Sequence, residues 1–159
     1  MSNLKEYDLL SWTEDKEIAK ITEGEKIYYS DFIARINRFG LNNERIILLT
    51  NKNLYHMKNK TLSRKIPYSE IIGITMHKNS NEFILHLNNE EPDFHYKSKN
   101  KNLLICQICK LYQASTNKAL KLCEIEKNLK QYLTPKKDKK KNTSVTKMDE
   151  KFLINTINF

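Results

Sequence analysis

The chain has 159 residues and a mass of 18.9 kDa, which fits one domain with appendages and excludes two full domains. It contains 39% hydrophobic and 30% charged residues with only three Gly and three Pro, a composition that excludes collagen-like and low-complexity chains. All of the net charge of +9 lies in residues 98–159, because the first 97 residues are neutral. Either an anionic partner or the Lys and Asn bias of an AT-rich genome accounts for this asymmetry.

The sequence shows neither a membrane span nor a secretory signal. Its longest apolar runs, Ile46–Leu49 and Leu103–Cys106, are four residues each, whereas a transmembrane helix needs about 20. The first ten residues carry acidic side chains and lack a basic start followed by an apolar stretch. Three cysteines, an odd number, indicate free thiols in a reducing compartment. We therefore expect a cytoplasmic protein without disulfides.

Residues 1–25 are predicted to form a helical appendage. Apolar residues recur at three- and four-residue intervals through residues 4–22, with a break at Ser11–Thr13, which indicates one broken helix or two short ones. Ser11 followed by Glu14 is a candidate capping box. We interpret Trp12 as a packing residue that fastens this appendage to the domain, because large aromatic side chains are mostly buried.

From residue 26 the pattern changes to short β-rich runs separated by polar clusters, which is typical of a small antiparallel sheet protein. The clearest alternation places Phe83, Leu85 and Leu87 on one face of a strand. Seven strands are expected, at Ile27–Asn37, Arg45–Thr50, Leu54–Met57, Ser63–Ile66, Ile72–His77, Glu82–Leu87 and Asp93–Lys97.

After Lys97 the apolar spacing becomes helical, which predicts one long helix or two consecutive helices. The second stretch begins near Ser115 and runs to Leu133, before Pro135 ends it. This places a domain at residues 26–133 and a basic linker with an apolar tail at residues 134–159. The linker lysines are Lys136, Lys137, Lys139, Lys140 and Lys141, and the apolar tail residues are Phe152, Leu153, Ile154, Ile157 and Phe159. Such a tail either docks on a partner or folds back onto its own domain.

Four stretches, IYYSDFIARINRFG, RIILLTNKNLYHM, RKIPYSEIIGITM and NEFILHLN, occur in an order and spacing that resemble the tail homology 1 (TH1) domain of class I myosins. The resemblance covers roughly residues 26–130, and its most specific part is Leu48–Tyr55 followed by Ile66, Pro67 and Ile71–Gly73. It implies a pleckstrin-homology-like (PH-like) fold, mainly β with a C-terminal helix (α+β), in which an antiparallel sandwich or barrel of about seven strands is capped by the helix. No P-loop pattern is present, so the resemblance implies the tail module as a stand-alone protein without a motor.

In this family, basic residues on the first strand and the loop after it bind phosphoinositide head groups. The matching positions are Arg35, Arg38 and Arg45, and the resemblance implies that they form charge-assisted bonds with phosphate oxygens. The sequence departs from the pattern at Asn42–Glu44, where such domains commonly carry Lys or Arg. The alternative interpretation is that the arginines are exposed, solubilising groups. Lys136–Lys141 offers a second, nonspecific attraction of about 1 kcal/mol per Lys near an anionic leaflet.

Other site chemistry is weakly supported by the sequence. Cys106 and Cys109 form an isolated CxxC, which favours core packing over a zinc site. The four histidines are dispersed over separate predicted strands, so the spacing supports no catalytic pairing and no cofactor. Nucleic-acid binding fits the basic pI of about 9.4, but recognition motifs are absent and only four of the 28 basic residues are Arg.

The sequence thus predicts a noncatalytic adaptor that binds anionic membrane lipids from the cytoplasm as a peripheral membrane protein. The alternative is a structural component of a cytoskeletal assembly, such as the microtubules of a ciliary axoneme, that has lost lipid binding and docks through its tail. Nucleic acids and small-molecule substrates are not expected partners.

Overall fold

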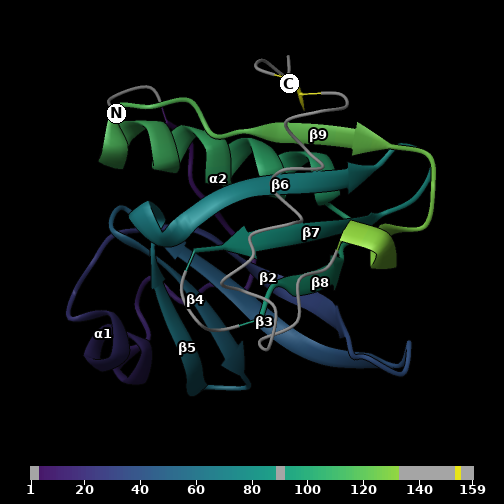
Figure 1. Ribbon diagram of the computed structural model, residues 1–159. Coiled ribbons are helices and arrows are strands. Elements are labelled where there is room, and N and C mark those ends of the chain that lie inside the picture. The colour runs from purple at the N-terminus through teal and green to yellow at the C-terminus, as the bar shows by residue number, and fades with distance from the viewer. Residues whose placement is uncertain (1–3, 89–91, 133–152, 155–159) are drawn as a thin grey trace.

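Seven consecutive strands and one helix form the main body of the computed structural model, which describes residues 4–88, 92–132 and 153–154 (Figure 1). All seven expected strands are present, and their observed ends differ from the predicted ones by three residues or fewer. The strands are β2 (Ile27–Ile36), β3 (Asn42–Thr50), β4 (Asn53–Lys58), β5 (Thr61–Pro67), β6 (Ile71–His77), β7 (Glu82–Leu87) and β8 (Phe94–Lys97), and the helix is α2 (Lys101–Thr116).

The seven strands form two antiparallel half-sheets, one of β2–β5 and one of β6–β8. They are joined only where β8 pairs with the end of β2, at Ala34 and Arg35. A one-turn 3-10 helix, η1 (Tyr68–Glu70), connects β5 to β6. A bulge between Ile71 and Gly73 interrupts the register of β6 on β7, as expected for a glycine within a strand. Two half-sheets followed by a helix are the PH-like architecture.

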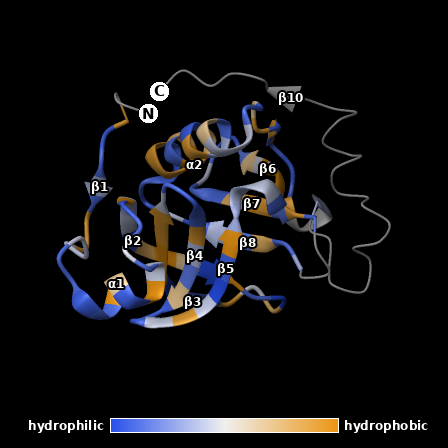
Figure 2. Ribbon diagram, turned by 90° about the vertical axis from the view of Figure 1, so that its left-hand side faces the viewer, coloured by the Kyte–Doolittle hydropathy of each residue, from blue (hydrophilic) through white to orange (hydrophobic). Residues whose placement is uncertain are grey.

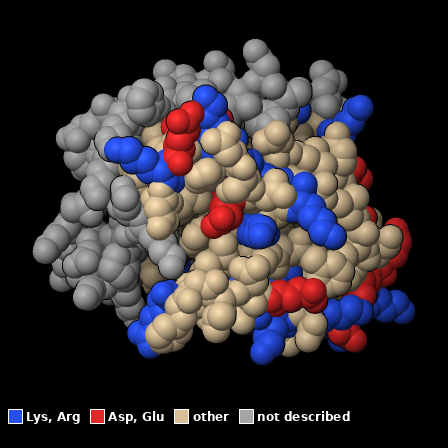
Figure 3. All heavy atoms as spheres, turned by 90° about the vertical axis from the view of Figure 1, so that its right-hand side faces the viewer, with Lys and Arg blue, Asp and Glu red and all other residues tan. Residues whose placement is uncertain are grey.

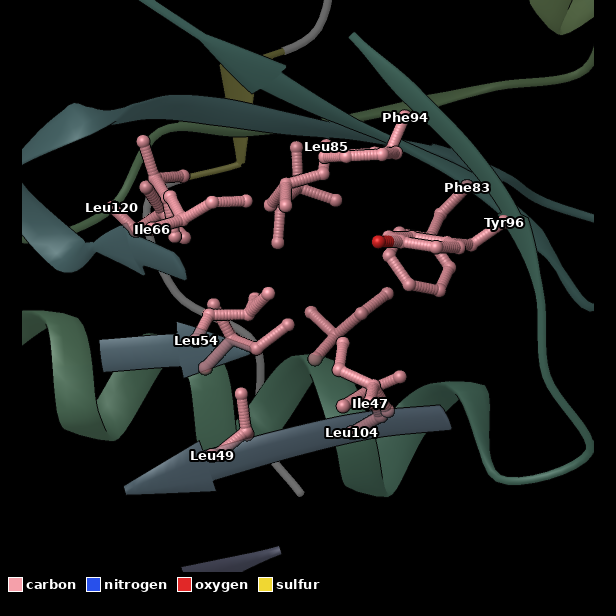
Figure 4. Close-up of a cluster of buried hydrophobic side chains, with 14 of the residues drawn as sticks. Ile47, Leu49, Leu54, Ile66, Phe83, Leu85, Phe94, Tyr96, Leu104 and Leu120 are labelled. Carbon is pink, nitrogen blue, oxygen red and sulfur yellow. The ribbon is translucent and has the colours of Figure 1, made fainter. Parts of the chain in front are cut away.

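The main core lies between the two half-sheets and α2 (Figure 4). Strand β3 places Ile47 and Leu49 in this core, whereas Ile46 and Leu48 belong to a second cluster on the other face of the same strand. Figure 2 shows hydrophobic residues on the strands and on α2. Leu54 and Ile47 from the first half-sheet point toward Phe83 and Leu85 from the second, and Leu104 reaches them from α2. Each of these five side chains is fully buried, and such side chains each contribute about 1.5–3 kcal/mol to folding. The face that lines this core is called the inner face below.

Helix α2 closes the sandwich with one apolar stripe. Leu104, Ile108 and Leu111 recur at helical spacing and are buried, whereas Lys110 on the other side is exposed. The helix ends at Asn117, which adopts a left-handed conformation with φ 60° and donates its N–H to the carbonyl of Gln113. Within the described residues, every helix is too short or too polar to span a bilayer.

The expected second helix after Ser115 is wrong. Strand β9 (Leu122–Ile125) runs parallel to β6 instead, and the 3-10 helix η2 (Leu129–Tyr132) follows. Strand β10 (Leu153–Ile154) pairs antiparallel with β9 and ends the described sheet, whose order is β10-β9-β6-β7-β8-β2-β3-β4-β5. The left-handed Asn117 stops the helix, and Leu120, Leu122 and Ile125 fit a strand as well as a helix.

The expected helices at the N-terminus are only partly present. Strand β1 (Tyr7–Asp8) pairs parallel with β2, and a single helix, α1 (Lys16–Thr22), follows. The predicted cap at Ser11 is wrong, because Asp15 accepts hydrogen bonds from the backbone N–H groups of Glu17 and Ile18. Asp8 makes the same kind of contact with the backbone N–H groups of Trp12 and Thr13. These bonds favour a turn between β1 and α1.

Trp12 packs the N-terminal segment onto the domain, as predicted from the sequence. Its side chain is 8% exposed and contacts a second core cluster on the outer face of the first half-sheet. This cluster also contains Ile18 from α1 and Leu48 and Tyr55 from the strands. The part of the segment from Leu10 to Ile21 therefore covers a sheet face that otherwise meets solvent, and Figure 1 shows α1 beside β4 and β5.

Gln107 holds the N-terminal segment from the opposite side. Its side-chain amide is 1% exposed and donates to the carbonyls of Lys5 and Tyr28, at 2.9 Å each. We expect Gln107→Ala to lower the free energy of unfolding by about 1–3 kcal/mol, because the buried Tyr28 carbonyl loses its donor. Chemical denaturation measures this loss, and Gln113→Ala, on the exposed side of the same helix, is the matched control. Equal stability of the two variants would contradict the prediction.

Candidate functional site

Two of the predicted arginines lie on the inner face of the first half-sheet. Arg45 on β3 is directly opposite the buried Ile33, and Arg35 on β2 is opposite the buried Tyr96 of β8. Residues directly opposite each other in a sheet share a face. Arg35 and Arg45 therefore extend the inner-face rows beyond the apolar core, and both side chains are half-buried.

A third arginine, Arg64 on β5, joins them from the other edge of the half-sheet. It is opposite His56 on β4, which is itself opposite the core residue Ile47. The sequence reasoning missed Arg64, although its position two residues before the apolar Ile66 on an alternating strand was the available signal. Arg35, Arg45 and Arg64 are called the arginine cluster below.

The ring of Phe94 orders part of this cluster. The guanidinium carbon of Arg35 lies 5.2 Å from the ring centroid and that of Arg64 lies 5.6 Å from it. His56 stacks against the same ring with centroids 4.6 Å apart. Because the face of an aromatic ring attracts cations, Phe94 holds two guanidinium groups beside one histidine.

The pKa of His56 is affected by the positive charge of the arginine cluster. Its side chain is 2% exposed, and its Nδ1 atom lies 2.6 Å from the Tyr96 hydroxyl in a hydrogen bond. Burial is the main cause that lowers the pKa of His56 from 6.5 to about 4, and the positive charges of Arg35, Arg45 and Arg64 lower it further. The three guanidinium groups thus create a positive potential at one point. Guanidinium groups arranged in this way suit a phosphate or another multivalent anion.

The third predicted arginine, Arg38, lies apart on the turn between β2 and β3. It is exposed, and its guanidinium carbon is 4.8 Å from the ring centroid of Phe39. This turn is shorter than expected, because β3 begins at Asn42 rather than at Arg45. Asn42–Glu44 are therefore strand residues.

This register changes the meaning of Glu44. Glu44 is opposite Ala34, so its side chain belongs to the outer face, whereas Arg45 belongs to the inner face. The acidic residue that weakened the family pattern in the sequence therefore points away from the arginine cluster. Asn43, opposite Arg35, is the inner-face position where a further cation is lacking.

The predicted tail sites lie mostly outside the described residues. This holds for Lys136, Lys137, Lys139, Lys140 and Lys141, and for Phe152, Ile157 and Phe159. Leu153 and Ile154 form β10, whose backbone pairs with Cys123 and Leu122 of β9. For these two residues the structure shows the fold-back arrangement.

Two surface hollows are less suited to an anion than the arginine cluster. One, of about 610 Å³, lies between the β6–β7 turn and the start of α2, where Lys101 donates to the carbonyls of His77 and Ser80 and Lys78 pairs with Glu126. The other, of about 570 Å³, includes the acidic Asp31 and Glu44. Basic and acidic side chains are interspersed over the face in Figure 3. Both hollows have acidic as well as basic side chains in their lining, Glu124 in the first and Asp31 and Glu44 in the second.

Three buried polar side chains are linked by hydrogen bonds in the order hydroxyl, imidazole and carboxylate, as in a hydrolase triad. Thr75 Oγ1 lies 2.7 Å from His86 Nε2, and His86 Nδ1 lies 2.8 Å from Asp93 Oδ2. Thr75 and His86 are 0% exposed, so a substrate does not reach the hydroxyl. We assign these three side chains a structural role, because their hydrogen bonds link β6, β7 and the residue before β8.

Cys106 is buried and Cys109 half-buried on α2, where Cys109 packs against the main core. Burial raises the pKa of the Cys109 thiol to about 12, which keeps it protonated and unreactive. Among the described residues, three or more His, Cys, Asp or Glu side chains do not come together as metal ligands. The CxxC therefore contributes to packing.

The chain matches the family model described as unconventional myosin tail, actin- and lipid-binding, over residues 8–158. None of the curated proteins matches it. Similar solved structures include the N-terminal PH domain of human ARAP2, with 13% identity over 55% of this chain and 80% of that one and a TM-score of 0.47. The Slm1 PH domain in complex with inositol-4-phosphate has 16% identity over 57% of this chain and 99% of that one, with a TM-score of 0.45. The family match extends beyond the stretch that carried the resemblance in sequence.

Proposed function

Since the chain belongs to the myosin TH1 family, the actin- and lipid-binding tails of unconventional myosins, we propose that it is a noncatalytic tail module that binds anionic phospholipids through the arginine cluster. Lys136–Lys141 adds nonspecific attraction to the same anionic surface in this proposal. The protein then acts as a peripheral membrane adaptor on the cytoplasmic side.

The observation that carries the proposal is the placement of Arg35, Arg45 and Arg64 on the inner face of the first half-sheet, with Arg35 and Arg64 over the ring of Phe94. Guanidinium groups form charge-assisted, often bidentate hydrogen bonds with phosphate oxygens, so a phosphorylated head group is an anion of suitable chemistry for this face. Arg35 and Arg64 are also oriented in advance by Phe94, which reduces the entropy lost when they bind a ligand. The outward orientation of Glu44 supports the proposal as well, because it leaves the inner face without that negative charge.

The test is co-sedimentation of the full chain with vesicles that contain or lack phosphoinositides, at low and at physiological salt. We expect Arg35→Ala/Arg45→Ala to weaken phosphoinositide-dependent binding by at least about tenfold, because each charge-assisted hydrogen bond contributes about 1.5–3 kcal/mol. Binding of the wild-type chain should survive physiological salt, since half-buried charges are screened less than exposed ones.

The matched control is Lys110→Ala/Lys118→Ala, which removes the same charge from exposed positions on and just after α2. An equal loss in both double variants would reduce the interaction to net charge and contradict a site at the arginine cluster. Absence of wild-type binding to all vesicles would contradict lipid binding altogether. We would then propose the other activity in the family description, binding to actin, with the tail residues Phe152–Phe159 as the docking segment.

A further inference from the structure

The β2–β3 turn carries the two most exposed large apolar side chains of the described residues. Phe39 is 71% exposed and Leu41 is 62% exposed. They are separated by one residue, Gly40, which adopts φ +80°. Two such side chains at the tip of a hairpin form a small apolar surface beyond the body of the domain.

Internal hydrogen bonds fix the shape of this turn. The side-chain carbonyl of Asn37 accepts from the backbone N–H groups of Phe39 and Leu41, at 2.9 and 3.0 Å. The main chain of Asn37 accepts from Gly40 at 2.9 Å and donates to the Leu41 carbonyl at 3.0 Å. The exposure of Phe39 and Leu41 is therefore built into an ordered turn.

The same bonds lower the penalty for moving the turn out of water. A backbone N–H without a partner is strongly disfavoured in an apolar medium. In this turn the N–H groups of Phe39, Gly40 and Leu41 already have acceptors inside the turn. The tip can leave water without breaking these bonds.

The charges next to the apolar tip identify its partner as an anionic surface. Arg38 lies beside Phe39 with its guanidinium over the ring, and Arg35 and Arg45 lie on the strands that lead into the turn. A long basic side chain beside an apolar tip can place its charge among lipid head groups while the ring enters deeper.

We propose that the β2–β3 turn inserts Phe39 and Leu41 into the acyl boundary of an anionic bilayer, with Arg38 at head-group level. The inference rests on the proposed function and deepens it, because it gives the domain a second, apolar membrane contact and an orientation. The turn points toward the bilayer, and Arg35 and Arg45 lie on the two strands behind it.

The first experiment measures depth directly, with vesicles of phosphatidylcholine, phosphatidylserine and phosphoinositide whose acyl chains carry bromine. Phe39→Trp places an indole at the tip, whereas Trp12, 8% exposed beneath α1, is the internal reference. We expect vesicles to quench and blue-shift the emission of the tip indole. The Trp12 emission of the wild-type chain should stay unchanged.

The second experiment measures affinity for the same vesicles without bromine. Phe39→Ser/Leu41→Ser should bind at least about tenfold more weakly, because two apolar side chains no longer leave water on binding. Leu9→Ser, which changes a 51% exposed leucine in the N-terminal segment, should bind as the wild type does.

The outcomes separate this inference from the proposed function. Vesicle binding without quenching of the tip indole overturns insertion and leaves head-group binding intact. Equal affinities of the double variant and the wild type also overturn it, and they leave Phe39 and Leu41 as a surface for a protein. Failure of the wild type to bind any of these vesicles overturns both proposals.

Discussion

His86→Ala is expected to lower the free energy of unfolding by about 3–5 kcal/mol, because it removes one partner of a buried pair. The side chains of His86 and Asp93 are both 0% exposed, with Nδ1 and Oδ2 2.8 Å apart. After the substitution, Asp93 keeps the backbone N–H of Leu87 at 3.1 Å but loses the imidazole. Urea denaturation followed by circular dichroism measures the change.

Two further variants make this result specific. His77→Ala removes a half-exposed imidazole from the end of β6 and should change stability by less than about 1 kcal/mol. Thr75→Val retains the His86–Asp93 pair and should have an intermediate effect, because only the hydroxyl contact is lost. If His86→Ala lowered the free energy of unfolding by less than about 1 kcal/mol, the structural role of Thr75, His86 and Asp93 would be contradicted.

Stability is also expected to fall as the pH is lowered from about 6.5 to about 4, because of His56. The pKa of His56 is lowered in the folded chain to about 4, so the unfolded chain binds the proton first. The contribution is fully present above the unfolded pKa and is lost as the pH falls through this range. At 1.36 kcal/mol for each pH unit, the loss amounts to about 3 kcal/mol.

The matched variant for this prediction is His56→Asn, which removes the titrating group and keeps a polar side chain beside the Tyr96 hydroxyl. Its stability should depend less on pH between 6.5 and 4 than that of the wild type, as measured by urea denaturation at fixed pH values. Parallel pH profiles of the two chains would contradict the assignment. Asp8 and Glu25, whose pKa values hydrogen bonds hold below their usual range, act at lower pH.

The central fold is predictable from sequence because its strands are short β-rich runs separated by polar clusters. Phe83, Leu85 and Leu87 identify one strand by themselves. Resemblance to TH1 domains then selected the PH-like arrangement, which the alternation alone leaves open among sandwiches. The flanking segments were less predictable, because Asp8 and Asp15 accept backbone hydrogen bonds that periodicity does not show.

The candidate site was predictable only in part. Arg35 and Arg45 lie on strands that the resemblance identified, so their positions followed from the sequence. Arg64 did not, because its closeness to them depends on a hairpin register and on the ring of Phe94, which comes from another half-sheet. The orientation of Glu44 away from the arginine cluster likewise depends on where β3 begins. Both facts concern three-dimensional pairing, which a charge count does not contain.

The bond between Gln107 and Lys5 has a consequence for the order of folding. The two residues are 102 positions apart, so the N-terminal segment gains this contact only after most of the chain has been made. At a synthesis rate of about 5–20 residues per second, at least about 5 s separate the emergence of the two partners from the ribosome. During that interval the N-terminal segment, which covers the outer face of β2–β4, lacks its hydrogen bond to α2. Contacts of such long range slow folding, and the N-terminal segment should be among the last parts to become protected from hydrogen exchange.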